Sequence, residues 1–200
     1  MAKVTAVVLA AGESRRMGKG TSKQLLPWGD TTVLGQTLQQ VRQSQIDDVL
    51  VVTGHQAHKV AAVARAHGAR VVHNPEYARG EMLSSLQKAV STLPPECDAV
   101  LVILADQPMV PSQTYDTIVA AYHRGGATLV APTFEGRRGN PVLIARALFQ
   151  ELLELPYGEA PRTLLRRHPE QLQLVEVESD AVLRDLDRPE QYERQRPNNE

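Results

Sequence analysis

A glycine-rich basic segment, residues 9–23, directly follows the first apolar stretch of the chain. It contains three glycines and four basic residues against a single acidic residue, Glu13. Glycines let backbone N–H groups approach an anion closely, and Arg and Lys side chains supply the countercharge. This chemistry suits a polyphosphate, and the alternative interpretation is a flexible, solvated basic loop.

Two common phosphate motifs do not describe this segment. Five residues lie between Gly12 and Gly18 where a Walker A motif has four, and Gly20 follows Lys19. The dinucleotide fingerprint G-x-G-x-x-G is also absent. A phosphate site in this segment must therefore be of another kind.

Carboxylates at two later points of the chain are candidates for holding a metal ion. Asp106 closely follows the apolar run 101–104, where an unpaired buried carboxylate would be costly. Asp185 and Asp187 lie two residues apart, so they share one face of an extended segment. Each carboxylate could ligate Mg²⁺, which prefers oxygen donors, or serve only as a helix cap or salt-bridge partner.

Short apolar runs alternate with longer helical stretches, and these elements must position the charged groups. The apolar runs predict strands buried on both faces, at 4–9, 49–53, 69–72, 100–104 and 128–131. Helices are expected between the strands, at 32–45, 56–66, 82–93 and 112–123. This order predicts a Rossmann-like, three-layer α/β/α fold with a mostly parallel central sheet. In such a sheet ligands bind outside the carboxyl ends of the strands.

The pattern of elements changes after Asn140. Further strands are expected at 141–144 and 172–177, with helices at 146–155 and 162–167. The length predicts one domain over residues 1–194, divided into halves at 1–135 and 136–194, with a frayed tail at 195–200.

The composition excludes several classes of protein. The 200 residues have a net charge of −1, which cannot provide the sustained field that non-specific binding to nucleic acid or membranes requires. The first apolar stretch is far shorter than the ~20 residues of a membrane span. The single cysteine, Cys97, cannot form an internal disulfide. We therefore expect a cytoplasmic protein with neither a nucleic-acid nor a membrane partner.

The basic segment also resembles a known signature. Leu9-Ala-Ala-Gly-Glu-Ser-Arg-Arg-Met-Gly18, followed by a lysine and Leu25-Leu26-Pro27, is similar to the loop of nucleotidyltransferases with a glycosyltransferase-A-like fold. The nearest group is the molybdenum cofactor guanylyl- and cytidylyltransferases. The resemblance implies that this loop binds a nucleoside triphosphate through Leu9, Ala10, Ala11, Gly12, Ser14, Arg16, Met17, Gly18 and Lys23.

Within that resemblance, two basic residues have a catalytic role. Arg16 and Lys23 would neutralise charge on the α-phosphate and on the departing pyrophosphate, and Lys19 is the alternative to Lys23. The pair Ala10-Ala11 looks like the cytidine-selecting version of the loop, so CTP is the favoured nucleotide.

The resemblance extends to three later segments. It implies that Asp106 and Asp187 bind Mg²⁺, with Asp185 as a further carboxylate beside them. The base would be recognised in the first half of the chain by Asn74, Gly80, Ser84 and Ser85. The acceptor would bind in the second half, at Arg137, Gly139 and Asn140.

The activity implied is transfer of a nucleoside monophosphate from an NTP to a phosphorylated small molecule, with release of pyrophosphate. For the nearest group the acceptor is molybdopterin or its molybdenum-loaded form, and a molybdenum hydroxylase is a possible protein partner. Two alternatives stay open: a nucleotidyltransferase acting on a sugar or polyol phosphate, and a non-catalytic carrier of the molybdenum cofactor.

Overall fold

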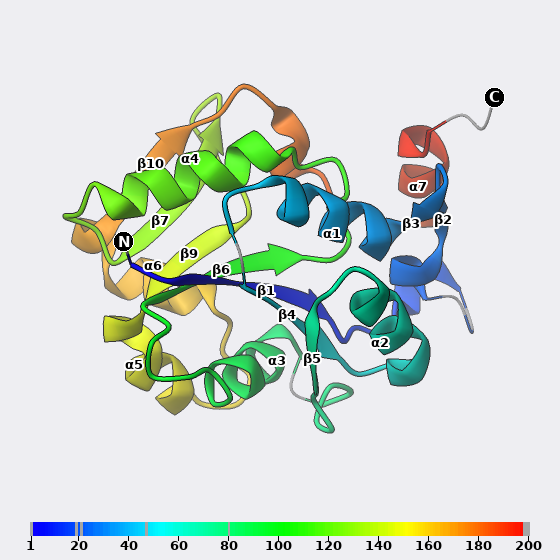
Figure 1. Ribbon diagram of the computed structural model, residues 1–200, viewed down its shortest axis with the longest axis horizontal. Helices are drawn as coiled ribbons and strands as arrows, with labels where there is room; N and C mark the ends of the chain where they lie inside the picture. Colours follow the sequence, from blue (N-terminus) through cyan, green and yellow to red (C-terminus); the bar gives the residue numbers. More distant parts are fainter. Residues whose placement is uncertain (1, 19, 21, 47, 80, 198–200) are drawn as a thin grey trace.

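The computed structural model describes residues 2–18, 20, 22–46, 48–79 and 81–197 of the chain. Its centre is an eight-stranded sheet with the order β10-β7-β9-β6-β1-β4-β5, and β8 pairs with β7. The strands are β1 Val4–Ala10, β4 Asp48–Thr53, β5 Arg70–His73, β6 Ala99–Leu104, β7 Leu129–Phe134, β8 Arg137–Arg138, β9 Val142–Ala145 and β10 Leu172–Glu176. Helices cover both faces of the sheet, so the predicted three-layer α/β architecture is confirmed (Figure 1).

Strand β1 lies in the middle of the sheet and explains why the strand sequences are so apolar. It runs parallel to β4 on one side and β6 on the other, and Val7 pairs with Leu50 and Val102. Alternate residues of β1 point to opposite faces of the sheet, and both faces are covered. Val7 and Val8 are therefore both fully buried.

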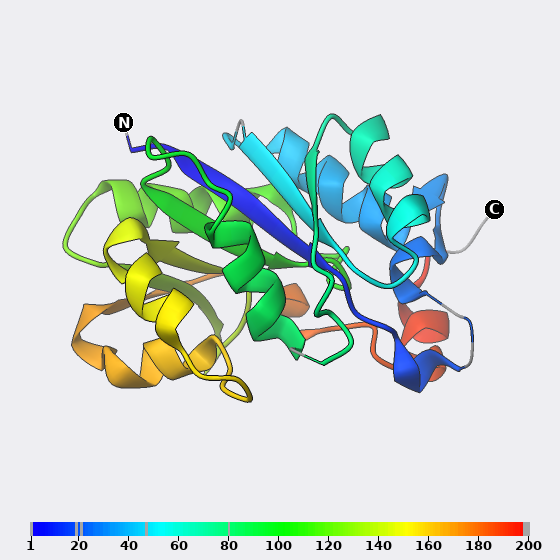
Figure 2. The same ribbon diagram turned by 90° about the horizontal axis from the view of Figure 1, so that it is seen from below.

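Two layers of helices bury these faces. One layer consists of α1 Val33–Gln43, α2 Ala57–Ala66 and α4 Ser112–His123. The other consists of α3 Glu81–Val90, α5 Phe149–Glu154 and α6 Arg162–Arg167. Figure 2 shows α3 and α5 in front of the sheet when the molecule is seen from below. Each layer contributes its own cluster of buried aliphatic side chains to the core.

The direction of β9 is the main departure from a parallel sheet. This strand runs antiparallel to both of its neighbours, β6 and β7. The loop that enters β9 therefore lies at the edge of the sheet where β6 ends. An apolar run indicates a buried strand but not the direction of that strand. The strand expected at 141–144 was therefore predicted without its antiparallel direction.

A small hairpin at one end of the molecule was not predicted. Strands β2 Pro27–Trp28 and β3 Thr31–Thr32 form a hairpin, and α7 Pro189–Gln195 packs beside it (Figure 1). Trp28, Tyr192 and Met17 belong to the apolar cluster that joins them. Residues 198–200 of the expected tail lie outside the described residues.

Short 3₁₀ helices complete the secondary structure, at Arg15–Met17, Lys23–Leu25, Arg146–Leu148, Pro169–Gln171 and Asp180–Leu183. None of the helices in the described part of the chain has the length and apolar character that crossing a membrane requires.

Candidate active site

The glycine-rich loop begins where β1 ends and folds back on itself through a short 3₁₀ turn. Ser14 has a left-handed backbone (φ 54°), and its carbonyl accepts a hydrogen bond of 2.8 Å from the Met17 amide. Gly18 also has a positive φ, 98°, which glycine adopts without steric cost. The turn directs Met17 into the apolar cluster, and this buried side chain anchors the loop.

Gln24 holds the two ends of this loop together. Its side chain is 3 % exposed, and its Oε1 accepts hydrogen bonds from Ser22 Oγ at 2.8 Å and Ser14 Oγ at 3.3 Å. Ser14 Oγ in turn accepts from the Lys23 backbone N–H at 3.0 Å. These contacts fix the point from which the Lys23 side chain projects. No pattern in the sequence pointed to Gln24, because a single buried amide has no periodicity of its own.

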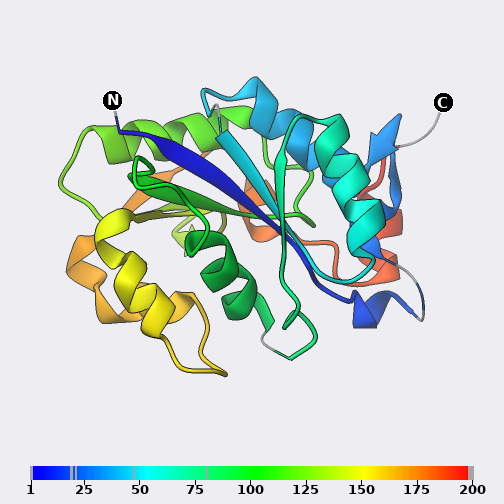
Figure 3. The same ribbon diagram turned by 60° about the horizontal axis from the view of Figure 1, so that its bottom comes forward.

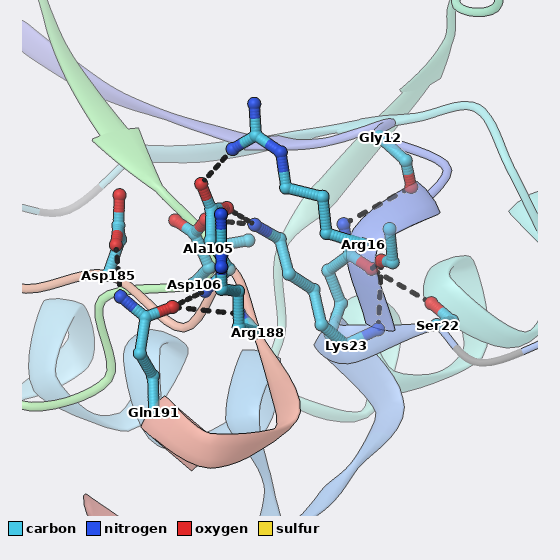
Figure 4. A network of polar contacts seen from close by, with 12 residues as sticks. Gly12, Arg16, Ser22, Lys23, Ala105, Asp106, Asp185, Arg188 and Gln191 are labelled. Atoms are coloured by element: carbon cyan, nitrogen blue, oxygen red, sulfur yellow. Dashed lines mark hydrogen bonds and ion pairs between the residues drawn. The ribbon is translucent and has the colours of Figure 1, made fainter. Parts of the chain in front are cut away.

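Four charged side chains from three distant segments meet beside this loop (Figure 4). Lys23 Nζ contacts Asp106 Oδ2 and, at 2.7 Å, Asp187 Oδ1. Arg16 Nη1 lies 2.8 Å from the other oxygen of Asp187. The side chains of Lys23 and Asp106 are only 13 % and 15 % exposed, so their charges are poorly screened by water. The structure thus brings together the predicted catalytic and metal-binding residues.

The segment that contains Asp187 is held against the end of β6. The Leu186 amide donates to the Asp106 carbonyl at 3.1 Å. Gln191, in the first turn of α7, accepts from the backbone amides of Asp187 and Arg188 at 2.9 and 2.8 Å. Helix α7 therefore positions one of the two carboxylates.

The electrostatics of this group differ from one carboxylate to the next. Burial acts to raise the pKa of Asp187, but hydrogen bonds and charges from Lys23 and Arg16 outweigh it and lower that pKa. For Asp185 burial and the charges of Asp187 and Asp106 together raise the pKa. Burial disfavours the Lys23 ammonium, yet the two carboxylates raise the pKa of Lys23 above its ordinary value. Lys23 is therefore a cation held between two carboxyl groups.

The donor set fits a divalent cation. Asp106 and Asp187 already converge on one positive atom, Lys23 Nζ, and both are hard oxygen donors. No group of three or more His, Cys, Asp or Glu side chains with metal-binding geometry occurs among the described residues. The protein would therefore supply two carboxylates, and phosphate and water oxygens the remaining ligands, as is usual for Mg²⁺.

A cavity of about 370 Å³ lies in front of the charged group. Its lining includes most of the predicted nucleotide and metal residues: Leu9, Ala11, Gly12, Ser14, Arg16, Lys23, Ser85, Asp106 and Asp187. It also includes residues that the sequence analysis did not select: Glu13, Arg15, Gln24, Tyr77, Ala78, Met82 and Leu104.

Several predicted nucleotide-binding residues do not line this cavity. Ala10 and Met17 are buried in the core and in the apolar cluster. Gly18 and Ser84 are not part of the lining either. Gly80 and the alternative lysine, Lys19, lie outside the described residues.

Asn74 supports the cavity wall instead of facing the cavity. It is 2 % exposed, and its amide group donates to Ser84 Oγ at 2.9 Å and Ser85 Oγ at 3.0 Å. Its Oδ1 accepts from the Glu76 amide at 3.0 Å. Asn74 thus ties the loop after β5 to the first turns of α3, and among the described side chains of α3 Ser85 is the polar one that lines the cavity.

Tyr77 forms an aromatic wall of the cavity. Its ring lies between the imidazoles of His55 and His73, with 6.4 Å between ring centroids in both pairs. A Cβ on Gly54 would lie 2.5 Å from Tyr77 Cβ, so glycine is required for this approach. Tyrosine in a turn-rich segment gave no signal in the sequence, because His55 follows β4 and His73 ends β5, and only the fold brings both beside this ring.

A second cavity, of about 410 Å³, adjoins the first, and Met82 and Leu104 line both. Of the predicted acceptor residues, Gly139 and Asn140 line it, whereas Arg137 does not and its neighbour Arg138 does. The Gly139 position has no room for a side chain, since a Cβ would lie 2.3 Å from the Val182 carbonyl oxygen. Apolar side chains such as Val102 and Ile144 also line this second cavity, and α6 contributes Arg162 and Leu165.

The fold and these cavities define a class of protein, the nucleotidyltransferases. Comparison with known proteins gives the family. The model of the MobA-like NTP transferase domain matches residues 6–172, so the chain belongs to this family.

Individual relatives cover almost the whole chain. Molybdenum cofactor cytidylyltransferase of Escherichia coli strain K12 is 25 % identical over 193 residues, 96 % of this chain and 95 % of that protein. Nicotine blue oxidoreductase of Paenarthrobacter nicotinovorans is 28 % identical over 197 residues, again 96 % and 95 %. The crystal structure of Rv0371c from Mycobacterium tuberculosis superposes with a TM-score of 0.83 at 31 % identity, covering 97 % and 98 % of the two chains. A further structure of Rv0371c is a complex with manganese, with a TM-score of 0.79 at 30 % identity over 96 % and 97 %.

Proposed function

We propose that this nucleotidyltransferase is magnesium-dependent and transfers a cytidylyl group from CTP to the phosphate of molybdopterin or its molybdenum-loaded form. The observation that carries the proposal is the group of Lys23, Arg16, Asp106 and Asp187 at the mouth of a glycine-rich loop. Two cations and two carboxylates in one cavity provide what a triphosphate and its divalent cation require. The relative named molybdenum cofactor cytidylyltransferase supports this choice of substrates.

The reaction is an in-line displacement at phosphorus. An oxygen of the acceptor phosphate attacks the α-phosphorus of CTP, the bond from the α-phosphorus to the bridging oxygen breaks, and pyrophosphate leaves with that oxygen. The acceptor phosphate is already ionised at pH 7, so no general base is needed. Catalysis then consists of positioning and charge neutralisation.

The residues divide this work between them. Asp106 and Asp187 would hold Mg²⁺, which supplies Lewis-acid neutralisation of the triphosphate when bound. Lys23 and Arg16 stabilise the negative charge that develops on the pyrophosphate side. Gly12 and Ser14 line the same cavity and bring backbone and hydroxyl groups toward the phosphates.

The two cavities separate the two substrates. The nucleotide occupies the cavity lined by the glycine-rich loop, with its base toward Ala11, Tyr77 and Ser85. The acceptor occupies the second cavity, at Arg138, Gly139 and Asn140. Because the cavities share Met82 and Leu104, an acceptor phosphate can reach the α-phosphorus without leaving its own cavity.

Pyrophosphate release tests the proposal directly. Each of the four NTPs is incubated with Mg²⁺ and with molybdopterin, or with a panel of sugar and polyol phosphates, as acceptor. We expect release to be fastest with CTP and molybdopterin. Release only with a sugar or polyol phosphate would assign the acceptor to that class, and tight molybdopterin binding without release under any condition would identify a carrier.

A further inference from the structure

The connection between α5 and α6, residues 155–161, reaches from the acceptor side to the nucleotide side of the molecule. At its apex the hydroxyl of Tyr157 donates a hydrogen bond to the carbonyl oxygen of Arg79, in the loop between β5 and α3. The Tyr157 side chain is otherwise open to solvent, with 77 % of the residue exposed. Figure 3 shows this connection below α5, extending toward the loop that precedes α3. Tyr157 therefore contributes a contact between segments and almost no packing.

Both ends of the connection are fixed. At the α5 end, Gln87 Nε2 of α3 donates to the carbonyls of Leu152 and Leu155 at 3.0 and 3.1 Å. At the α6 end, Glu159 accepts a hydrogen bond of 2.6 Å from Thr163 Oγ1. Residues 155–161 thus form an arch that is anchored to α3 and α6 at its two ends, so a displacement of Tyr157 would act on both helices.

The loop that Tyr157 contacts is also held from the opposite side. Arg15, on the glycine-rich loop, donates from Nη2 to the Ala78 carbonyl at 3.4 Å, and Glu13 orients its guanidinium at 2.6 and 2.9 Å. Two consecutive carbonyls, those of Ala78 and Arg79, are therefore bound by the two halves of the molecule. Tyr77 and Ala78 line the first cavity.

The residues after Tyr157 belong to the second cavity. Glu159, Ala160 and Pro161 form part of its lining, directly beyond the arch. Met82, which lines both cavities, is 44 % exposed between them. One hydrogen bond thus joins a segment that borders the acceptor cavity to a loop that borders the nucleotide cavity.

We propose that Tyr157 is a positioning residue that couples the two cavities: through Arg79 it sets the loop of residues 74–79, and occupancy of either cavity is transmitted to the other. This inference rests on the proposed function, since it presumes that a nucleotide fills the first cavity. Coupling between two binding sites is reciprocal, so ordering of the loop by nucleotide must also order the arch. The structure thereby assigns the α5–α6 connection a role in synchronising the two substrates.

Hydrogen exchange with and without Mg²⁺-CTP tests the coupling. In the wild-type protein we expect CTP to slow exchange at amides 76–79, in the loop that contributes Tyr77 and Ala78 to its cavity, and also at amides 157–160, which lie outside that cavity. In Tyr157→Phe we expect the second effect to disappear, while unliganded exchange at 76–79 becomes faster. Loss of one exposed hydrogen bond corresponds to about a two- to tenfold rise in the Kd for CTP, measured by calorimetry.

Tyr122→Phe is the matched control. The Tyr122 hydroxyl also donates to a backbone carbonyl, that of Asp98, but at the opposite edge of the sheet. This variant should leave both the CTP affinity and the exchange at 157–160 unchanged, and both variants should retain the wild-type melting temperature within a few degrees.

The outcomes separate the two proposals. If CTP protects 76–79 but not 157–160 in the wild-type protein, or if Tyr157→Phe behaves like the wild type, the coupling is refuted and the proposed function stands. If none of the four NTPs binds the wild-type protein, the proposed function fails, and the coupling falls with it.

Discussion

Opposite edges of the sheet contain two ion-pair groups made from similar residues. At the amino edge, Asp48 begins β4 and Arg70 begins β5, and the guanidinium binds both carboxylate oxygens, at 3.0 and 2.7 Å. Thr5 adds a hydrogen bond of 2.6 Å. At the carboxyl edge, Lys23 is shared between Asp106 and Asp187, with Asp185 close by.

The two groups differ both in burial and in how their charges are matched, since Lys23 and Asp106 are only 13 % and 15 % exposed whereas Arg70 is 47 % exposed. The side chains of Asp48 and Asp187 are 40 % and 32 % exposed. Asp48 and Arg70 satisfy each other in a planar, bidentate pair, which needs no further partner. At the other edge two cations, Lys23 and Arg16, face the three carboxylates of Asp106, Asp187 and Asp185, and burial and the neighbouring anions raise the pKa of Asp185. A group with this surplus of negative charge is suited to receiving a further cation.

The largest effect is expected from Asp106→Ala. Pyrophosphate release should fall by roughly 10³-fold or more, because the variant loses a carboxylate that we propose as a ligand of the divalent cation. The fold should survive, which circular dichroism and thermal melting will show. Asp48→Ala is the matched control at the other edge and should keep full activity; equal rates for all three proteins would remove the proposed metal site.

Lys23→Ala should lower turnover by roughly 10²-fold, the usual cost of losing one electrostatic stabiliser of the transition state. The reason for selecting Lys23 is its contact with both carboxylates. Lys19→Ala provides the comparison in the same assay and should be nearly silent. The reverse result would assign the role to Lys19, which lies outside the described residues.

Lys23→Met should strengthen metal binding, although loss of Lys23 lowers turnover. Without nucleotide, the affinity for Mn²⁺ should rise about three- to tenfold, because the variant loses a cation that competes for Asp106 and Asp187. Electron paramagnetic resonance of free Mn²⁺ measures this change. Arg70→Met should leave the affinity unaltered, and weaker Mn²⁺ binding in Lys23→Met would contradict the shared use of the carboxylates.

The smallest effect is expected at the amino edge. Burial acts to raise the pKa of Asp48, but hydrogen bonds from Arg70 and Thr5 outweigh it and lower that pKa. The pair therefore stabilises the fold at every pH above the ordinary carboxyl value of 3.8, and the contribution is lost as the pH falls through the lowered value. Asp48→Asn should reduce the free energy of unfolding by about 1 kcal/mol or less at pH 7.

Urea denaturation of the wild type and Asp48→Asn at pH 7, 5 and 3 measures this contribution. The difference between the two proteins should be equal at pH 7 and 5 and smaller at pH 3. A difference that grows toward low pH would contradict the lowered pKa of Asp48.

Much of the fold was predictable because buried strands and amphipathic helices have clear patterns. The run 4–9 became β1 Val4–Ala10, and the helix expected at 112–123 is α4 Ser112–His123. The hairpin of β2 and β3 was not predictable, because two residues per strand are too few to show periodicity.

The charged residues of the candidate site were predictable because they belong to recognisable motifs. Residues whose role depends on tertiary contacts were not predictable. Lys23, Asp106 and Asp187 were expected together and lie together. Asn74 was expected to contact the base, but its side chain is buried and its amide group donates to Ser84 and Ser85 instead. Tyr157 is the opposite case, because nothing in the sequence around this tyrosine indicates a role. Its hydrogen bond to the Arg79 carbonyl becomes visible only in the structure.

The reversed direction of β9 has a consequence for how this molecule could diversify. Residues 136–141 connect β7 to β9 and include β8, which pairs with Thr133 and Phe134, whereas β7 pairs with β9 through Leu129 and Val130. The exposed side chains of Arg137 and Arg138 could be exchanged while the glycine-rich loop and its carboxylates keep their geometry, whereas Gly139 must stay because no Cβ fits beside Val182. On our proposal that the second cavity binds the acceptor, exchanging these two side chains between homologues should shift the enzyme to a different phosphorylated compound.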